Sequence, residues 1–312
     1  MLYDYTNVKK YLINSIQRGT MNIKKIVSLI FICASIAFFA PALSSAQDYD
    51  SSSESGINSG NHGLHIRGAL GAGKIFWGYI SYGSSSGDLG TGPGGNINIA
   101  AMYNYSLVSF EFNLLSGNVG DLEWTDKDSG GVEHKYKSTG SGKYNVYDWK
   151  LGAKLFTEPG DMGYTFFYLG KRYWNSERTQ DTIEYDGFKQ SITDKRKAKG
   201  DGWIFGFRDF STIGLDNSLA IVIQSGLFFG KAPVTKMTTN GVDQTYPVKD
   251  SVSLGGELGA GVAFQNIGLS IIGGARGEIN ATSFKDSAAT GSDESIFGFG
   301  NAVFFIEAGM MF

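Results

Sequence analysis

Ten charged residues recur within apolar segments of the chain, where acidic and basic side chains could pair with one another or line a conduit. They are Arg67, Glu111, Asp148, Lys150, Lys154, Arg208, Glu257, Arg276, Glu278 and Glu307. Both signs of charge are present, and an unpaired buried charge is costly. We therefore expect these side chains to form salt bridges in an enclosed space. The alternative is a narrow, charge-lined channel for small polar solutes.

Residues suited to catalysis or metal binding are few. The chain has three histidines, His62, His65 and His134, and no metal-ligand spacing links them. Its single cysteine, Cys33, lies in an apolar run near the beginning of the chain. The sequence thus predicts no metal, no cofactor and no disulfide, and we expect the protein not to be an enzyme.

The segments that carry the charges alternate between apolar and polar residues, as strands with two different faces do. The clearest example places Leu254, Leu258 and Val262 between small or polar residues. We expect ten strands, at about 63–80, 97–103, 108–114, 147–155, 164–174, 203–208, 219–229, 252–264, 267–278 and 300–312. Aromatic residues occupy both faces of 164–174, so the pattern does not decide which face of that strand points outward.

The connections between the expected strands alternate in length. Those after odd-numbered strands are long and polar, as at 117–143, 175–200, 231–250 and 281–295, whereas those after even-numbered strands are tight turns. Asn240-Gly241 predicts a hairpin tip in one long segment, and Asp186-Gly187 could form another. An outer-membrane barrel with short turns at one end and long loops at the other produces this alternation. A soluble β-sandwich or lipocalin-like barrel does not explain it.

The last expected strand ends on an aromatic residue. Apolar residues occupy its alternate positions: Phe304, Ile306, Ala308, Met310 and Phe312. This ending resembles the C-terminal assembly signal of bacterial outer-membrane β-barrel proteins. The resemblance implies an all-β fold, a closed antiparallel transmembrane β-barrel of about ten strands, in a Gram-negative outer membrane; eight or twelve strands stay open. It also implies outer-membrane lipid, lipopolysaccharide, the barrel-assembly machinery and periplasmic chaperones as partners.

The beginning of the chain predicts export. A pair of lysines precedes an apolar run over 26–40, and a stretch of small residues ends at Ala46, as in a secretory signal peptide. The run is shorter than the roughly 20 residues that a membrane-spanning helix needs, which disfavours an anchor. We expect translation to start at Met21, residues 1–20 to be a spurious extension and cleavage to follow Ala46. Residues 47–62 would then be a flexible tail and 63–312 the barrel.

The composition suits a barrel. Glycine accounts for 44 of 312 residues and aromatic residues for 14%, with only five prolines. Small and aromatic residues suit crowded barrel interiors and the two membrane interfaces, respectively. We expect Trp149, Tyr164, Trp174 and Trp203 to lie at these interfaces. The formal net charge of −3 gives no reason to expect nucleic acid as a partner.

A basic run precedes the expected strand at 203–208. Its members are Lys195, Arg196, Lys197 and Lys199. Clustered cations suit phosphate groups, so the run could bind lipopolysaccharide; the alternative is a solvated loop end.

The sequence contains part of one catalytic pattern. The omptin proteases, which are ten-stranded barrels, use an acidic pair spaced by one residue and a later Asp-x-His. Asp121 and Glu123 resemble the first element, but no histidine follows His134. We therefore expect a structural or surface-interaction role with a side-chain-filled lumen. A narrow porin-like channel is the first alternative, and an omptin-like or lipid-modifying hydrolase is the second.

Overall fold

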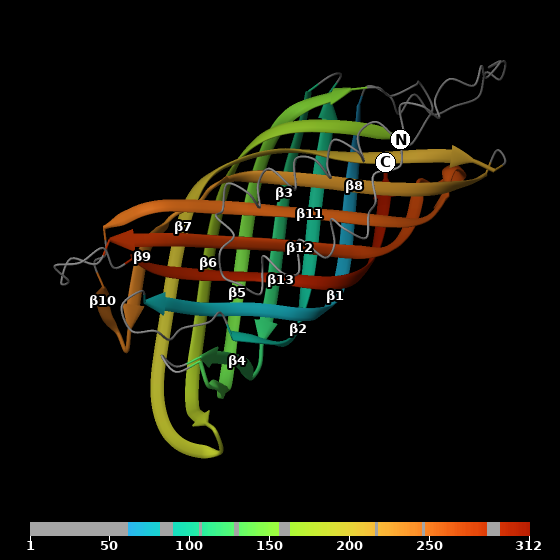
Figure 1. Cartoon of the computed structure of the whole chain (residues 1–312). Coiled ribbons are helices and arrows are strands. Elements are labelled where there is room, and N and C mark those ends of the chain that lie inside the picture. Colours follow the sequence, from blue (N-terminus) through green and yellow to red (C-terminus); the bar gives the residue numbers. More distant parts are fainter. Residues whose placement is uncertain are drawn as a thin grey trace, which may run out of the picture. The chain divides into compact units, whose positions relative to one another are not determined.

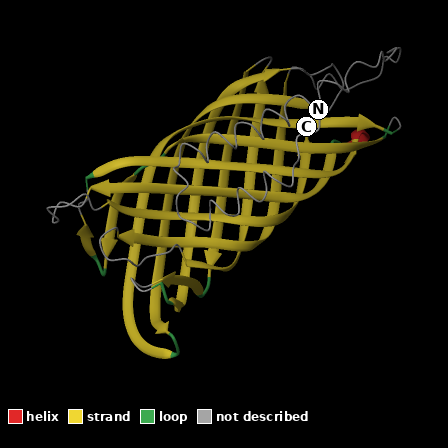
Figure 2. Cartoon of the chain, viewed as in Figure 1, coloured by secondary structure: helices red, strands yellow, loops and turns green. Residues whose placement is uncertain are grey.

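The computed structural model of the chain describes residues 62–81, 90–105, 108–127, 131–155, 163–215, 218–244, 247–285 and 294–312. The expected leader and nearly all of the expected tail lie outside these ranges. The described chain is almost entirely strand, with one short 3₁₀ turn, η1 (Gln265–Ile267) (Figure 2). No helix in the described chain is long and apolar enough to cross a membrane.

Within the described residues, ten strands form the wall of a barrel. They are β1 (His62–Ser81), β2 (Gly90–Tyr105), β3 (Val108–Val119), β5 (Glu133–Leu155), β6 (Tyr164–Tyr185), β7 (Phe188–Gly214), β8 (Leu219–Lys231), β11 (Val248–Phe264), β12 (Leu269–Lys285) and β13 (Glu294–Met311). Three shorter strands extend this sheet: β4 (Leu122–Lys127), β9 (Val234–Thr239) and β10 (Val242–Gln244).

Each wall strand pairs antiparallel with the next, and β13 pairs with β1 to close the ring (Figure 1). The closing register places Ile66 opposite Met310. Beyond β13, the backbone of Phe312 exchanges hydrogen bonds of 3.2 and 2.8 Å with that of Leu64. The predicted closed antiparallel barrel is thus confirmed, and its terminal strand is paired along its length on both sides.

The outer face of the wall is apolar, as the period of two predicts. On β13, Phe304 and Ile306 are 79% and 69% exposed, whereas Val303, Phe305 and Glu307 between and beside them are buried. The same alternation holds on the other wall strands, where large apolar side chains face outward. Monomeric proteins in water do not expose apolar surface on this scale, whereas lipid-facing barrel strands require it.

The long polar segments expected as loops are largely strand. β4 and β5 occupy much of 117–143, β6 and β7 run through 175–200, and β9 and β10 lie in 231–250. The φ angles are 45° at Asp186 and 85° at Gly187, and 51° at Asn240 and 82° at Gly241. These are the left-handed values that a two-residue type I′ turn requires. The hairpin tip predicted at Asn240-Gly241 is therefore confirmed. The period-two test missed these strands because it needs one apolar face, and both of their faces are largely polar.

Candidate functional site

All ten charged residues singled out in the sequence lie inside the barrel. Their side chains come from β1, β3, β5, β7, β11, β12 and β13, and each occupies the inward-facing positions of its strand. Their side chains are buried. The wall therefore encloses a layer of charge.

Six of these side chains form a closed ring in which arginine and glutamate alternate. The order around the ring is Arg208, Glu111, Arg67, Glu307, Arg276, Glu257 and back to Arg208. The six separations between nitrogen and oxygen atoms, in that order, are 2.6, 3.0, 3.4, 3.6, 2.6 and 2.7 Å. Because β7 lies five strands around the wall from β1, and β3 lies five strands from β11, the ring of charges spans the interior.

Glu111 has the most cationic partners in the ring. It is 0% exposed and accepts hydrogen bonds from Arg67, Arg208 and Lys150, the last at 2.7 Å. Every carboxylate of the ring contacts at least two cations. Hydrogen bonds between charged partners are the strong ones, and they satisfy these groups without bulk water.

A second group of charges adjoins the ring and centres on Arg172, which the sequence analysis missed. Its Nε and Nη2 each donate to Asp148 at 2.8 Å, its Nη1 donates to Ser253 at 3.0 Å, and Glu278 lies 3.6 Å away. Aromatic residues on both faces of 164–174 obscured the inward parity of this strand. The signal available was the adjacent pair Lys171-Arg172, since neighbouring residues of a strand point to opposite faces and one of the two must point inward.

Lys154 lies nearer the end of the barrel that has the short turns. Its ammonium is 5.5 Å from the centre of the Tyr164 ring, which stacks on Phe210. These rings belong to an apolar group that we call the inner cluster. The inner cluster comprises Ala69, Met102, Tyr164, Phe166, Tyr168, Ile204, Phe210, Ala220, Val222, Ala263, Ile272 and Phe305.

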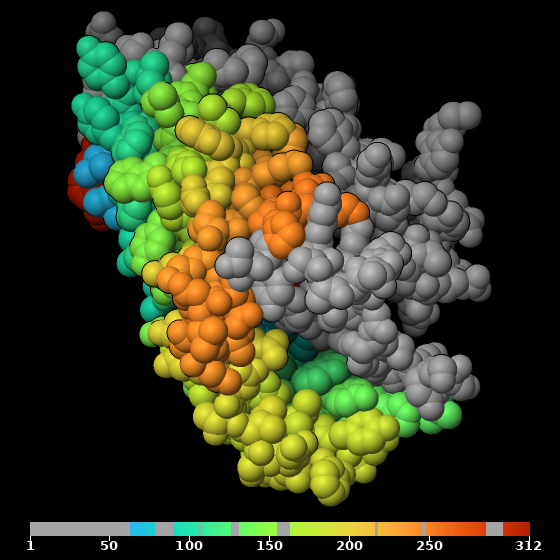
Figure 3. All heavy atoms as spheres, turned by 90° about the vertical axis from the view of Figure 1, so that its left-hand side faces the viewer, coloured from blue at the N-terminus to red at the C-terminus, as the bar shows by residue number. Residues whose placement is uncertain are grey.

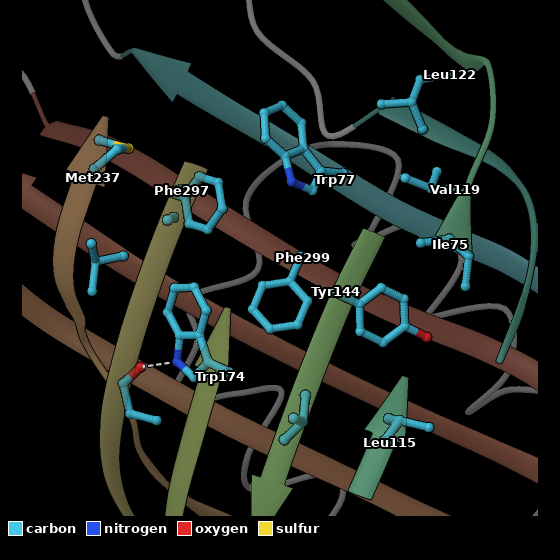
Figure 4. Close-up of a cluster of buried hydrophobic side chains, with 14 of the residues drawn as sticks. Ile75, Trp77, Leu115, Val119, Leu122, Tyr144, Trp174, Met237, Phe297 and Phe299 are labelled. Carbon is cyan, nitrogen blue, oxygen red and sulfur yellow. Dashed lines mark hydrogen bonds between the residues drawn. The ribbon is translucent and has the colours of Figure 1, made fainter. Parts of the chain in front are cut away.

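A second apolar group, the outer cluster, fills the other end of the barrel, where β4 and β9 extend the wall. Figure 4 shows its aromatic rings directed toward one another from several strands, with Trp174 bonded through Nε1 to the carbonyl of Ala232 at 2.8 Å. Trp77 donates to Ser176 at 2.8 Å. The outer cluster comprises Ile75, Trp77, Leu115, Val119, Leu122, Tyr144, Val146, Trp174, Ala198, Ala232, Val234, Met237, Phe284, Phe297, Phe299 and Val303.

Two of the four aromatic residues expected at the membrane interfaces are in these clusters instead. Trp174 and Tyr164 are 3% and 2% exposed, whereas Trp149 and Trp203 are 46% and 58% exposed on the outer face. The expectation for Trp174 and Tyr164 was wrong because β6 directs its even-numbered residues inward, and its sequence pattern alone did not show which parity faced in.

Little space remains between the charges. The cavity among the described side chains of the ring and the Arg172 group has a volume of about 40 Å³, which is room for a few water molecules at most. One carboxylate oxygen of Glu278 borders this region without a hydrogen-bond partner among the described residues, so a water molecule there would satisfy it. In the described structure, the lumen is a layer of charge between two apolar layers.

β7 contains the whole basic run, which is in a strand rather than at a loop end: Lys195, Arg196, Lys197 and Lys199. The three lysines are exposed on one face, and Glu177 of β6 contacts Lys197 at 3.0 Å and Lys195 at 3.1 Å. Hydrogen bonds from these two lysines hold the pKa of Glu177 below its usual range. Lys199 lies opposite Lys236 of β9, and Figure 3 shows the ends of β7 and β9 together on one face of the molecule.

Both residues of the omptin-like acidic pair contact β5, and His134 has an acidic partner that the sequence did not reveal. Asp121 accepts a hydrogen bond from the backbone of Gly140, and Glu123 contacts a lysine of β5. His134 Nδ1 lies 2.6 Å from Asp186 of the β6–β7 turn, which is 52 residues further along the chain. That contact is the first cause holding the pKa of Asp186 below its usual range. The long hairpin brings the two residues together, and no local motif marks them.

In the described part of the chain, no group of three or more histidine, cysteine or acidic side chains is arranged to hold a metal ion.

No protein-family model matches the sequence, and no curated relative is similar to it. Solved structures are similar in fold. The outer membrane protease OmpT from Escherichia coli superposes with a TM-score of 0.53 and 11% identity, over 84% of this chain and 100% of that one. The translocator domain of autotransporter NalP from Neisseria meningitidis superposes with a TM-score of 0.40 and 10% identity, over 91% of this chain and 97% of that one. The COG4313 outer membrane channel from Pseudomonas putida F1 superposes with a TM-score of 0.25 and 11% identity, over 85% of this chain and 100% of that one. The first of these similarities shows that the chain has the fold of an outer-membrane β-barrel.

Proposed function

We propose that the protein is a non-enzymatic outer-membrane barrel whose lumen does not conduct, and that it acts by presenting its extended outer sheet to the surroundings of the cell. The observation that supports this most directly is the closed ring of six charges, with an apolar cluster on each side. A channel for polar solutes needs a continuous wet path, and these layers leave about 40 Å³ between the charges.

The extended outer sheet supports the second half of the proposal. β6 and β7 are 22 and 27 residues long, whereas a transmembrane strand needs about 9–11 residues. More than half of this hairpin therefore projects beyond the membrane. A paired, twisted extension of this length is a more rigid platform for binding than a set of flexible loops.

Lipopolysaccharide is the proposed neighbour of this sheet on the membrane side. Lys195, Lys197 and Lys199 face the same way as the lipid-facing Trp203 of the same strand, a few residues further from the membrane. Ammonium groups at that height suit phosphate groups of the outer leaflet. We also propose the barrel-assembly machinery and periplasmic chaperones as folding partners, on the strength of the apolar alternation that ends at Phe312.

Single-channel recording tests the closed lumen. The protein is purified from bacterial outer membranes and inserted into planar bilayers, and quenching of the exposed Trp149 and Trp203 by brominated lipid establishes insertion. We expect no conductance steps. Stable steps that change in size in Glu257→Gln or Arg276→Ala would show an open, charge-lined pore and would reject the proposal in favour of a channel.

A further inference from the structure

Two rows of side chains cross β4, β5, β6 and β7 next to the turn at Asp186-Gly187. The first row consists of Trp124, Tyr136, Tyr185 and Phe188, which lie opposite one another on successive strands. Directly opposed residues of antiparallel strands share a face of the sheet, so this face carries an aromatic row. The Trp124 and Tyr136 rings are stacked with their centres 5.3 Å apart, and the Tyr185 ring lies 4.9 Å from that of Tyr136.

The second row lies on the opposite face and carries charges of alternating sign. Its members, in strand order, are Glu123, Lys137, Glu184 and Lys189. Each is the sequence neighbour of a residue of the aromatic row, and neighbouring residues of a strand point to opposite faces. Directly opposed residues of opposite charge stabilise a sheet, and Lys137 lies 3.7 Å from Glu123. We call this set the charge row; it ends on β7 with a lysine, beside the phenylalanine that ends the aromatic row.

Both rows end at a part of β7 that has a neighbouring strand on one side only among the described residues. Residues 188–191 and 194 pair with β6, whereas the other side of β7 is paired from Lys195 onward, first by the backbone of Asn240 and then by β9. We call residues 188–194 the β7 edge. A sheet edge with unpaired N–H and C=O groups is a template for a further strand.

The direction of the backbone groups along the β7 edge follows from the turn. The two-residue turn joins Tyr185 to Phe188, which is the pair whose backbone groups face each other in such a hairpin. Because backbone groups alternate in direction along an antiparallel strand, those of Lys189 and Ser191 face away from β6. These two residues can therefore pair with another strand without loss of the bonds to β6.

Hydrogen bonds hold the turn beside this edge. His134 Nδ1 lies 2.6 Å from Asp186 and 2.9 Å from the Tyr185 hydroxyl. The other carboxylate oxygen of Asp186 accepts from the backbone N–H of Lys135 at 3.0 Å. Phe188, just past the turn, is 72% exposed. The edge is thus held in place before a partner arrives, which lowers the entropic cost of binding.

We propose that the β7 edge binds an extended segment of another polypeptide, which adds to the sheet as a further strand. An aromatic residue of that segment would lie opposite Phe188, and its acidic neighbour would lie opposite Lys189, so that each row gains one member. Backbone hydrogen bonds to Lys189 and Ser191 would supply affinity, and the alternation of aromatic and acidic side chains would supply specificity. The inference rests on the proposed surface role and adds the chemical class of the partner.

Fluorescence anisotropy of labelled peptides, titrated with the purified protein in a zwitterionic detergent at neutral pH, tests the proposal. The main probe is an octapeptide that alternates tyrosine and glutamate. A tyrosine–lysine octapeptide tests the charge row, and the main probe methylated on its glutamate backbone nitrogens tests the backbone pairing. We expect saturable binding of the main probe, and binding about tenfold weaker or more for each of the other two.

Three variants separate the backbone from the charge. Ser191→Pro removes an N–H that faces away from β6, a position at which an edge strand tolerates proline, and should weaken binding of the main probe about tenfold or more. Asp243→Pro makes the same change on the edge strand β10 and is the matched control, which should bind as the unmodified protein does. Lys189→Glu keeps the backbone and should reverse the preference toward the tyrosine–lysine probe. Unchanged heat-modifiable migration on gels establishes that each variant keeps its barrel.

Three results would overturn the proposal: no saturable binding of the main probe, equal binding in Ser191→Pro, or equal affinity for the two charged probes in both the unmodified protein and Lys189→Glu. Self-association of the unmodified protein that is lost in Ser191→Pro would also overturn it, because the edge would then belong to a second copy of the chain. A barrel that is silent in bilayers but binds no peptide would retain the proposed function and reject only this partner. Conductance steps would reject the closed lumen whatever the peptide titrations give.

Discussion

Replacing Glu111 by glutamine removes the negative charge that three buried cations share. Arg67 and Arg208 each keep a second carboxylate of the ring, but Lys150 loses its contact at 2.7 Å and keeps no acidic group within 4 Å among the described residues. Removing one partner of a buried ion pair costs about 3–5 kcal/mol, because the remaining charge stays buried. We expect Glu111→Gln to lower the free energy of unfolding by about 4 kcal/mol.

Glu307→Gln is the matched control in the same ring. Glu307 contacts Arg67 and Arg276 at 3.4 and 3.6 Å, and both arginines keep closer carboxylates, at 3.0 and 2.6 Å. No cation is left alone, so the loss should be about 1–2 kcal/mol, the value of a weak charged hydrogen bond. The two variants make the same chemical change at the same depth and differ in the number and length of the contacts.

Urea-induced unfolding of the barrel in lipid vesicles, followed by tryptophan fluorescence, measures both losses by linear extrapolation. If the unfolding free energy depends on urea concentration with the same slope in the variants as in the unmodified protein, the unfolding reaction itself is unchanged. The reasoning fails if Glu111→Gln loses less than 1 kcal/mol, or if Glu307→Gln loses as much as Glu111→Gln does.

Two further predictions concern the packing of the outer cluster and the tip of the outer hairpin, which is the turn at Asp186-Gly187 between β6 and β7. Gly117→Ala should cost about 1–3 kcal/mol, because a Cβ at that position would lie 2.3 Å from the buried Tyr144 ring, whereas Gly68→Ala has nothing within 4 Å and should be nearly neutral in the same urea experiment. Because the pKa of Asp186 is depressed in the folded protein, its bond to His134 stabilises the tip fully at pH values above the normal carboxylate pKa of about 4. This stabilisation is lost as the pH falls through the lower pKa of the folded state. The protection factors of the tip amides, which are the intrinsic exchange rates at each pH divided by the observed rates, should therefore fall in acid, and this fall should be absent in Asp186→Asn; an identical fall in that variant would assign it to another group.

The faces of the strands were predictable because alternation is a local property. Phe304 and Ile306 face outward, and Glu307 faces inward because its position differs from each of theirs by an odd number. Where both faces carry aromatic residues, as in β6, the period gives no answer, and Arg172 was therefore missed and Trp174 misplaced.

The partners of the lumen charges were not predictable from alternation. Each partner depends on the register between strands, and for non-neighbouring strands it also depends on the stagger of the closed barrel. The pairing of Asp148 with Arg172 is symmetric about position 160, so a known turn centre would have predicted it. The contact between Arg67 and Glu307 follows only from closure of β1 on β13.

The hairpin of β6 and β7 shows a second limit of prediction from sequence. His134 and Asp186 meet because β5, β6 and β7 stay paired as far as the turn between β6 and β7, and nothing in a polar sequence distinguishes a long paired strand from a loop except its turn residues. Asp186-Gly187 was the one local signal, and it fixed the tip of the hairpin without fixing the contacts of that tip.

The ring of six charges also has a consequence for the order of events during folding. Its members come from the first wall strand and the last, and Arg67 and Glu307 are 240 residues apart, so the ring cannot close until the two ends of the sheet meet. Until that moment its arginines and glutamates remain hydrated, and the ring contributes little to the transition state of assembly. Interactions that form after the transition state slow unfolding without accelerating folding. The ring should therefore govern how long a finished barrel persists in the membrane rather than how quickly it is made.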